Sequence, residues 1–266
     1  MASQFLQIIF EPPIAVVRIE RPEKRNAMSL ALLRELHDAA RELRERTDIC
    51  VVIMTGTEGY FSAGMDLSDP EFNTLANAPL SAKRRLMSYA PRMCRAWEEL
   101  DQVTIAAIEG FCLGGGVSLA CSMDFRVMAE SSYIQAPEIE YGMNMSWGTL
   151  PRLVHLIGPA RTNQLIILAE KVAAHEAHAW GFAQWVCADG SALEMAKSVA
   201  GKIASKPHAP VCMTKQTVNA IAKAFDQTVS HMDRDQFLLS VSDDESGERI
   251  ASFLDRKKSP GKGVDP

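Results

Sequence analysis

The sequence predicts an α/β fold with a helical C-terminal region. Three short apolar runs, at residues 50–56, 104–110 and 124–129, have the composition of strands that a parallel sheet buries on both faces. Helical patterns separate these runs, and alternation of this kind is typical of α/β architecture. We therefore expect an α/β core over residues 1–200, followed by helices over residues 201–266.

The N-terminal elements follow from local sequence signals. Residues 15–20, AVVRIE, form a β-prone run that ends at an Arg-Pro pair. In the next segment, RPEKRNAMS, Ser29 can accept a hydrogen bond from the first turn of a helix. The apolar side chains that recur at helical spacing after it are Leu32, Leu33, Leu36, Ala39, Ala40 and Leu43. A buried strand at 50–56, a glycine-containing loop at 56–67 and a polar stretch at 68–79 follow.

The same signals continue through the rest of the chain. A helix is expected across residues 84–97, and three successive glycines open a helix of small side chains before the strand at 124–129. From about Pro159 onward the strand signals fade and helical signals dominate. The expected helices there cover residues 163–172, 192–203, 209–225 and 232–254. The polar tail after them is expected to be frayed.

The composition excludes several classes of function. Acidic residues outnumber basic ones, with a net charge of -5, so no overall basic field is available to hold nucleic acid. The six cysteines are scattered without a Cys-x-x-Cys pair, which is typical of reduced thiols and not of a zinc site. The most apolar stretch, residues 104–123, is broken by Glu109 and four glycines, so no membrane span is expected. With no recognisable signal peptide, we expect a cytoplasmic protein.

Two glycine-bearing segments carry chemical information. Residues 61–67, FSAGMDL, follow a strand, and residues 110–116, GFCLGGG, lie between a strand and a helix. Glycines at such turns let backbone N–H groups approach a ligand closely, and a helix N-terminus favours negative charge. Each segment alone is a weak signal, and simple tight packing of strand against helix is the better explanation for one such loop. Neither segment matches a phosphate-binding loop.

Together, in this order and at this separation, the two segments resemble the crotonase superfamily, the enoyl-CoA hydratase/isomerase family. RPEKRNAMS resembles the CoA-contacting turn of that family, and APEIEYG at residues 136–142 resembles its catalytic-acid segment. The resemblance implies a ClpP/crotonase-like spiral of ββα units and an acyl-CoA thioester substrate. It also implies that no cofactor is needed beyond the CoA of the substrate. The expected assembly is a homotrimer or a dimer of trimers, formed through the helical region at 201–266.

The resemblance also assigns roles to residues of the two segments. Backbone N–H groups of Met65 and Gly115 would stabilise the negative charge that develops on the thioester oxygen, a type of interaction worth about 2.7–4 kcal/mol per donor. The residues expected to bind substrate around them are Lys24, Arg25, Ala27, Ala63, Gly64, Asp66, Leu67, Gly114, Ser118 and Trp147.

The acid–base residues decide which reaction follows. Glu138 occupies the position of the second of the two glutamates found in the hydratases, whereas Ser118 stands where the first is expected. A serine hydroxyl is no base near neutral pH without an activating group. One carboxylate favours double-bond isomerisation, while hydration of a 2-enoyl-CoA and a non-catalytic acyl-CoA-binding subunit remain as alternatives. Glu140 is expected on an extended segment, pointing away from Glu138.

Two further features leave their interpretation open. Bulky Met143, Met145 and Trp147 replace small residues that many hydratases carry beside the acyl path, and they could either reshape the pocket or simply fill the core. His175 and His178 share a helical spacing, but they lack a third metal ligand and are interpreted as surface residues.

Overall fold

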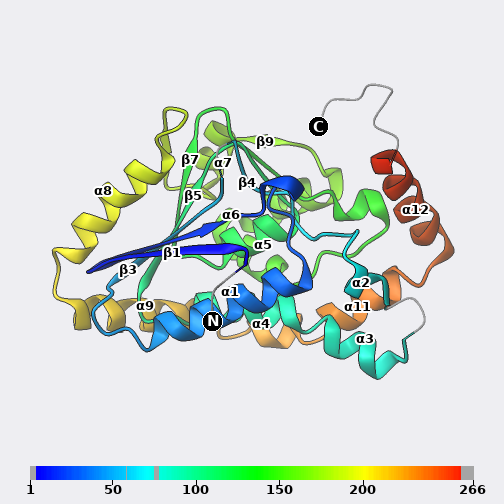
Figure 1. The fold of residues 1–266 in the computed structure, drawn as a ribbon, viewed down its shortest axis with the longest axis horizontal. Helices are drawn as coiled ribbons and strands as arrows, with labels where there is room; N and C mark the ends of the chain where they lie inside the picture. Colours follow the sequence, from blue (N-terminus) through cyan, green and yellow to red (C-terminus); the bar gives the residue numbers. More distant parts are fainter. Residues whose placement is uncertain (1–3, 58, 75–77, 259–266) are drawn as a thin grey trace.

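The computed structural model describes residues 4–57, 59–74 and 78–258. Its larger sheet contains six strands: β1 (Leu6–Glu11), β2 (Ile14–Ile19), β3 (Val51–Thr55), β5 (Val103–Ile108), β7 (Phe125–Ala129) and β10 (Trp185–Cys187). They follow the order β1-β2-β3-β5-β7-β10 (Figure 1). β1 and β2 form an antiparallel hairpin, and every later pair in this sheet is parallel. The three strands predicted from continuous apolar runs thus lie side by side in its centre.

A smaller sheet repeats the same chain order. Its strands are β4 (Tyr60–Ser62), β6 (Phe111–Leu113), β8 (Tyr133–Gln135) and β9 (Val172–Ala173). β4, β6 and β8 each follow a strand of the larger sheet and pair in parallel, and β9 closes the sheet by antiparallel pairing with β8. Three successive units therefore place one strand in each sheet before the chain enters helices. This repetition is the spiral of ββα units that the family resemblance implies.

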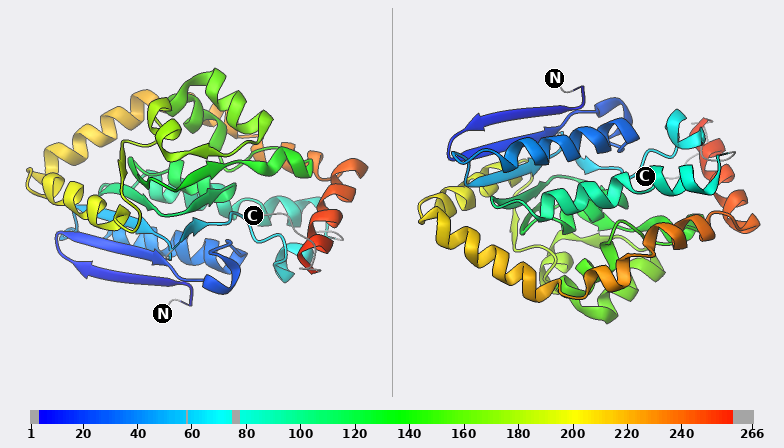
Figure 2. Two further views of the ribbon diagram at one scale, coloured as in Figure 1. Left: turned by 90° about the horizontal axis from the view of Figure 1, so that it is seen from above. Right: turned by 90° about the horizontal axis from the view of Figure 1, so that it is seen from below.

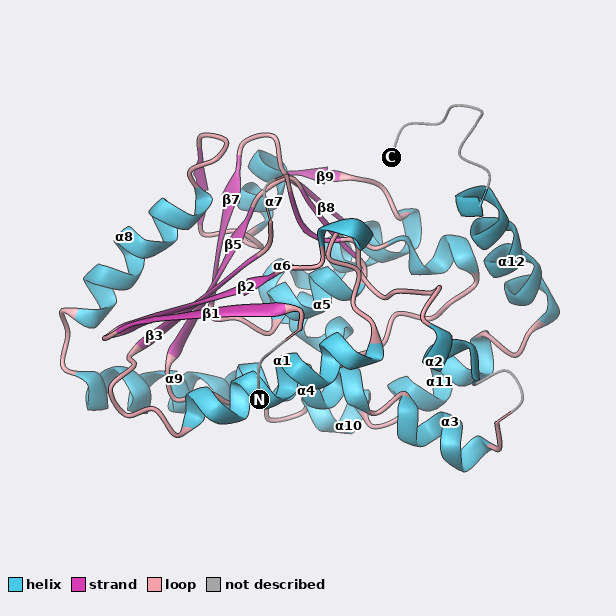
Figure 3. Ribbon diagram, in the orientation of Figure 1, coloured by secondary structure: helices cyan, strands magenta, loops and turns pink. Residues whose placement is uncertain are grey.

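Helices surround the two sheets (Figure 3). They are α1 (Leu30–Arg44), α2 (Pro70–Asn73), α3 (Leu80–Leu86), α4 (Tyr89–Glu98), α5 (Gly115–Cys121), α6 (Thr149–Asn163), α7 (Ala174–Trp180), α8 (Ala192–Ala204), α9 (His208–Ala222), α10 (Asp226–Ser230), α11 (Asp233–Ser240) and α12 (Asp244–Lys258). Three short segments are helical but not α-helical. They are the 3-10 helices η1 (Pro22–Lys24) and η3 (Pro137–Tyr141) and the π-helix η4 (Gln164–Leu168).

The core lies on both faces of the larger sheet. α8 packs on one face with alanines and Val199, whereas α1 and α4 belong to the larger cluster on the other face. The Ser29 hydroxyl accepts a hydrogen bond from the Leu32 N–H and begins α1, as the sequence predicts. The indole N–H of the fully buried Trp97 donates to Leu36 O at 3.0 Å, which ties α4 to α1. This packing fixes the strand ends from which the glycine turns leave.

Several sequence-based boundaries are wrong. The helix expected at residues 84–97 is divided into α3 and α4, which join at Met87 and Ser88. The helix expected at 163–172 is instead a continuation of α6 through η4, and it is followed by strand β9. β10 also lies in the part where helical signals dominate the sequence, and no strand is predicted there. Both strands have two or three residues and sit at sheet edges, so neither contains an apolar run that marks it.

The C-terminal region is helical, as expected, but more divided. α9 corresponds to the helix expected at 209–225, and the single helix expected at 232–254 is divided into α11 and α12. Figure 2 shows α9 to α12 following one another along one edge of the molecule. Buried Lys215 fastens α9 to the core by bonds to Asp124 Oδ2 and Gln102 O, both at 2.7 Å. Within the residues described, no helix is long and apolar enough to cross a membrane.

Candidate active site

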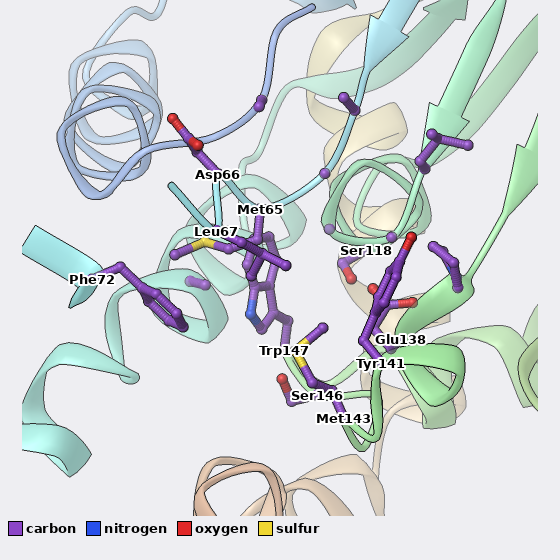
Figure 4. Close-up of a pocket in the computed structure, with 18 of the residues that line it drawn as sticks. Met65, Asp66, Leu67, Phe72, Ser118, Glu138, Tyr141, Met143, Ser146 and Trp147 are labelled. Atoms are coloured by element: carbon purple, nitrogen blue, oxygen red, sulfur yellow. The ribbon is translucent and has the colours of Figure 1, made fainter. Parts of the chain in front are cut away.

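A cavity of about 820 Å³ opens between the two glycine turns and the helices of the C-terminal region (Figure 4). Its wall includes each residue that the sequence analysis selected as catalytic or substrate-binding. They are Lys24, Arg25, Ala27, Ala63, Gly64, Met65, Asp66, Leu67, Gly114, Gly115, Ser118, Glu138 and Trp147. The chain therefore brings together residues more than one hundred positions apart.

The two glycine turns meet at Gly64. This residue has φ +83°, and a Cβ at its position would lie 2.8 Å from Leu113 O and 3.2 Å from Gly115 N. Only glycine adopts this conformation without strain and leaves room for the second turn. The backbone of Met65 and the first residue of α5, Gly115, are consequently neighbours at the wall of the cavity.

The neighbouring backbone hydrogen bonds constrain the amides of this pair. Met28 N–H donates to Gly64 O at 2.7 Å and Asp66 N–H donates to Met28 O at 3.0 Å. In such a parallel bridge the amide of Met65 itself faces away from Met28. Gly115 begins α5, where a backbone N–H has no acceptor within the helix.

The first turn is held by buried polar contacts. Arg21 Nη1 lies 2.8 Å from Asp66 Oδ2 and 2.6 Å from Ala27 O. Burial favours the neutral form of Asp66, but hydrogen bonds from Ser68 and Arg21 outweigh it and lower the pKa of this carboxyl. Asp66 is therefore an ionised anchor of the turn. Lys24 and Arg25 are exposed at the mouth of the cavity, next to this anchor.

Glu138 points its carboxyl group into the cavity from the start of η3 (Figure 4). Its Oε2 is buried, and no group in the described part of the chain hydrogen-bonds to it. This desolvation raises the pKa of Glu138 to about 7. Gly114 leaves the space that Glu138 occupies, since a Cβ there would lie 2.6 Å from Oε1.

Glu138 is the one acid of the described cavity wall that is both buried and unpaired. The other two acids of this wall are Glu23, which is exposed on η1, and Asp66, which pairs with Arg21. Glu140 lies outside the wall and is exposed. The extended segment predicted around Glu140 is wrong, because residues 137–141 form a 3-10 helix.

Ser118 lines the same cavity as Glu138, is buried, and belongs to a small hydroxyl network. Its Oγ lies 2.7 Å from Thr149 Oγ1, which is also bonded to the carbonyl oxygen of Ser146. Because a carbonyl oxygen can only accept, the Thr149 hydroxyl donates its proton to Ser146 O. The Ser118 hydroxyl then donates to Thr149 Oγ1. No basic group activates Ser118 within this network. Its side chain can accept a hydrogen bond from a ligand, but it supplies no second carboxylate.

Trp147 forms the wall next to Gly115. A Cβ on Gly115 would lie 2.6 Å from the indole Cη2. Trp147 and Gly148 have φ +65° and φ +70°, and Arg152 donates to both of their carbonyl oxygens at 2.8 and 3.0 Å. Arg152 is held in turn by Glu98, through contacts of 2.7 and 2.9 Å. Trp147 thus lines the cavity and also packs against the core, so both interpretations of this residue hold.

Sequence reasoning missed the side of the cavity that the helices contribute. These residues are Phe72, Leu86, Met87, Tyr141, Arg234 and Phe253. Tyr141 lies in the APEIEYG segment but was not selected there, whereas the other five come from segments without a local motif. Only the tertiary fold brings those five to the site. His175 and His178 are exposed, as expected, and the described residues contain no cluster of three potential metal ligands.

Comparison with known proteins gives consistent results. A profile described as enoyl-CoA hydratase/isomerase matches residues 10–263. A short-chain-enoyl-CoA hydratase of Clostridium acetobutylicum is 30% identical over 253 residues, which cover 94% of this chain and 95% of that protein. A crotonyl-CoA hydratase of Syntrophomonas wolfei is 28% identical over 260 residues, covering 97% and 98% of the two chains.

Solved structures show the same fold. An enoyl-CoA hydratase from Bacillus anthracis aligns with a TM-score of 0.77 and 28% identity, covering 95% of this chain and 97% of that one. An enoyl-CoA hydratase from Mycobacterium avium subsp. paratuberculosis aligns with a TM-score of 0.85 over 99% and 100% of the two chains. Its sequence identity is only 20%, so this second likeness concerns the fold alone.

Proposed function

The chain belongs to the enoyl-CoA hydratase/isomerase family and has the crotonase fold, and we propose that it moves the double bond of an enoyl-CoA thioester. The observation behind this proposal is the carboxyl group of Glu138 beside the two glycine turns, whose Oε2 is buried and has no hydrogen-bond partner among the described residues. In this proposal CoA is part of the substrate, and no other cofactor takes part.

The glycine turns would hold the reacting thioester. Met65 N–H and Gly115 N–H would donate to its carbonyl oxygen and stabilise the charge of the enolate as it forms. Lys24 and Arg25, exposed at the mouth, would meet the phosphates of CoA. The support is that all four residues line one cavity and that Gly64 brings the two turns into contact.

Glu138 would carry the proton between two carbons of the bound chain. As a carboxylate it removes a proton from C2 of a 3-enoyl-CoA, and the electron pair moves into a dienolate whose charge rests on the thioester oxygen. The same carboxyl then returns the proton to C4, so the double bond moves from C3–C4 to C2–C3. One residue that alternates between base and acid balances the reaction.

Hydration is the second candidate, because the two relatives described above are named hydratases. In that reaction a water molecule adds across the double bond of a 2-enoyl-CoA, and Glu138 alone would have to serve both proton transfers. A parallel assay of 2-enoyl- and 3-enoyl-CoA esters separates the two. Water addition to the 2-enoyl esters, with no turnover of any 3-enoyl ester, would reject isomerisation.

The pH dependence tests the protonation state. Because burial raises the pKa of Glu138 to about 7 and the base form starts the isomerisation, kcat/KM should rise as the pH increases through this value and then level off. The measurement is kcat/KM for a 3-enoyl-CoA in buffers of constant ionic strength. A rate that falls over the same range would identify the neutral acid as the active form.

We also propose that the chain forms a homotrimer, alone or as a dimer of trimers, through its C-terminal helices. Large apolar side chains are exposed there, among them Ile221 (75%), Phe225 (78%) and Leu239 (74%). Sedimentation should give the mass of three or six chains of 29.2 kDa each. Phe225→Asp should lower the measured mass toward that of a single chain. Ile9→Asp, on the exposed side of β1, serves as the control. A parent protein that sediments as one chain would refute the assembly.

A further inference from the structure

Arg234 brings a cationic side chain to the helical wall of the cavity. Among the described residues that line the whole cavity, the cations are Lys24, Arg25 and Arg234. The first two belong to the exposed turn at η1, whereas Arg234 lies on α11, which Figure 1 shows beside α3 and away from that turn. Gly148 N–H donates to Asp233 Oδ2 at 2.8 Å, so α11 is bound to the turn that carries Trp147.

The charge of Arg234 is poorly compensated by the protein. Its nearest acid is Asp235, with Arg234 Nη2 3.5 Å from Oδ2. Both oxygens of Asp235 already bind Arg84, at 2.6 and 3.1 Å. The Nε of Arg234 is buried, and no described group accepts from it. Such a buried donor is unfavourable until an acceptor reaches it.

Two residues of the described cavity wall therefore each have a buried polar side-chain atom without a partner: Glu138, through Oε2, and Arg234, through Nε. Glu138 has a role in the proposed proton transfer, but Arg234 has none. Most of the other residues that the helices contribute to the described wall are apolar, among them Leu86, Met87, Phe237 and Phe253. A plain hydrocarbon chain would leave the guanidinium without an acceptor.

We propose that Arg234 binds a carboxylate at the far end of the acyl chain, so that the preferred substrate is the CoA thioester of a dicarboxylic acid. This inference rests on the proposed function, which places CoA at the Lys24-Arg25 turn and the thioester between the glycine turns. The acyl chain then extends past Trp147 toward α11. A carboxylate is the natural partner of a guanidinium, since its two oxygens match the donor geometry.

Binding of unreactive, saturated esters tests the subsite without relying on any reaction. Succinyl-, glutaryl-, adipyl- and suberyl-CoA are compared by calorimetry with butyryl-, pentanoyl-, hexanoyl- and octanoyl-CoA. In the parent protein at least one dicarboxylic ester should bind about 10- to 100-fold more tightly than its monocarboxylic match, as expected for a charge-assisted hydrogen bond. Arg234→Met should abolish this preference, and Arg234→Lys should retain part of it.

The matched control is Arg249→Met. Arg249 is exposed on α12, where it pairs with Glu245 at 2.7 Å and donates to Glu140 O at 3.4 Å, and it does not line the cavity. Its replacement removes one positive charge, as Arg234→Met does. Equal affinity of the parent for both ester series would overturn the proposal. An equal loss for both series in Arg234→Met would also overturn it, because Arg234 would then contact the CoA part that they share.

Turnover of the corresponding enoyl esters separates this inference from the proposed function. If the dicarboxylic esters bind more tightly but no 2-enoyl or 3-enoyl ester reacts, the carboxylate subsite stands and the proposed reaction fails. If the monocarboxylic enoyl esters react and the saturated series show no preference, the reaction stands and the subsite fails.

Discussion

Glu138→Gln is expected to lower kcat for double-bond isomerisation by about 100- to 10,000-fold, the usual contribution of a general acid–base residue. Glutamine keeps the size of the side chain but cannot accept and return a proton. Because Glu138 is the one buried, unpaired acid of the described cavity wall, no neighbouring carboxyl is placed to replace it. The dissociation constant of a saturated acyl-CoA should remain within a few-fold of the parent value.

Glu140→Gln is the matched control for this variant. Glu140 lies two residues further along η3, is exposed, and does not line the cavity, so its substitution should leave kcat unchanged. If Glu138→Gln retained more than about a tenth of the parent kcat, Glu138 would not be the proton carrier.

The same variant has a thermodynamic signature. The pKa of Glu138 is raised from 4.5 to about 7, so between these values the folded protein binds more protons than the unfolded chain. The free energy of unfolding contributed by this residue therefore falls as the pH rises. The free energy of unfolding of Glu138→Gln minus that of the parent should therefore increase by up to about 3 kcal/mol as the pH rises across this range. Urea unfolding at several pH values measures it.

The parts of the fold with strong local signals could be predicted from the sequence. The central strands β3, β5 and β7 are continuous apolar runs because both of their faces are covered. The two glycine turns are visible because their close approach admits no side chain, which Gly64 shows directly. These local requirements are also the ones that shape the candidate site.

The remainder depends on contacts between distant segments. Strand β9 exists because two residues pair with β8, and β10 because three pair with β7. The left-handed conformation of Trp147 is likewise supported by Arg152 and, through it, by Glu98 on α4. None of these arrangements has a local sequence signature, and the same is true of Arg234 on α11.

The site depends as much on small residues as on charged ones. Ser118 leaves a neutral hydroxyl where a second acid is expected, so Glu138 is not opposed by a nearby like charge and its raised pKa comes from burial. Gly114 keeps open the space for the Glu138 carboxyl, and Gly115 does the same for the indole of Trp147. Changing a glycine here should therefore affect chemistry more than folding.

Gly114→Ala is expected to reduce kcat by at least about 100-fold, because an ångström-scale displacement of a reacting group costs this much. The new methyl group would lie 2.6 Å from Glu138 Oε1, so the carboxyl must move from the position where it would meet the substrate. Alanine at φ +49° also strains the backbone, which should lower the free energy of unfolding by about 1–3 kcal/mol.

Gly190→Ala separates the two effects of that substitution. Gly190 has φ +77°, so alanine there imposes similar backbone strain, yet no atom lies within 4 Å of the added Cβ. Both variants should therefore lose stability in urea unfolding, while only Gly114→Ala should lose kcat. Equal losses of kcat in both would attribute the effect to strain and global destabilisation. Full activity of Gly114→Ala would show that the carboxyl need not occupy this position, and with it the proposed geometry of proton transfer would fail.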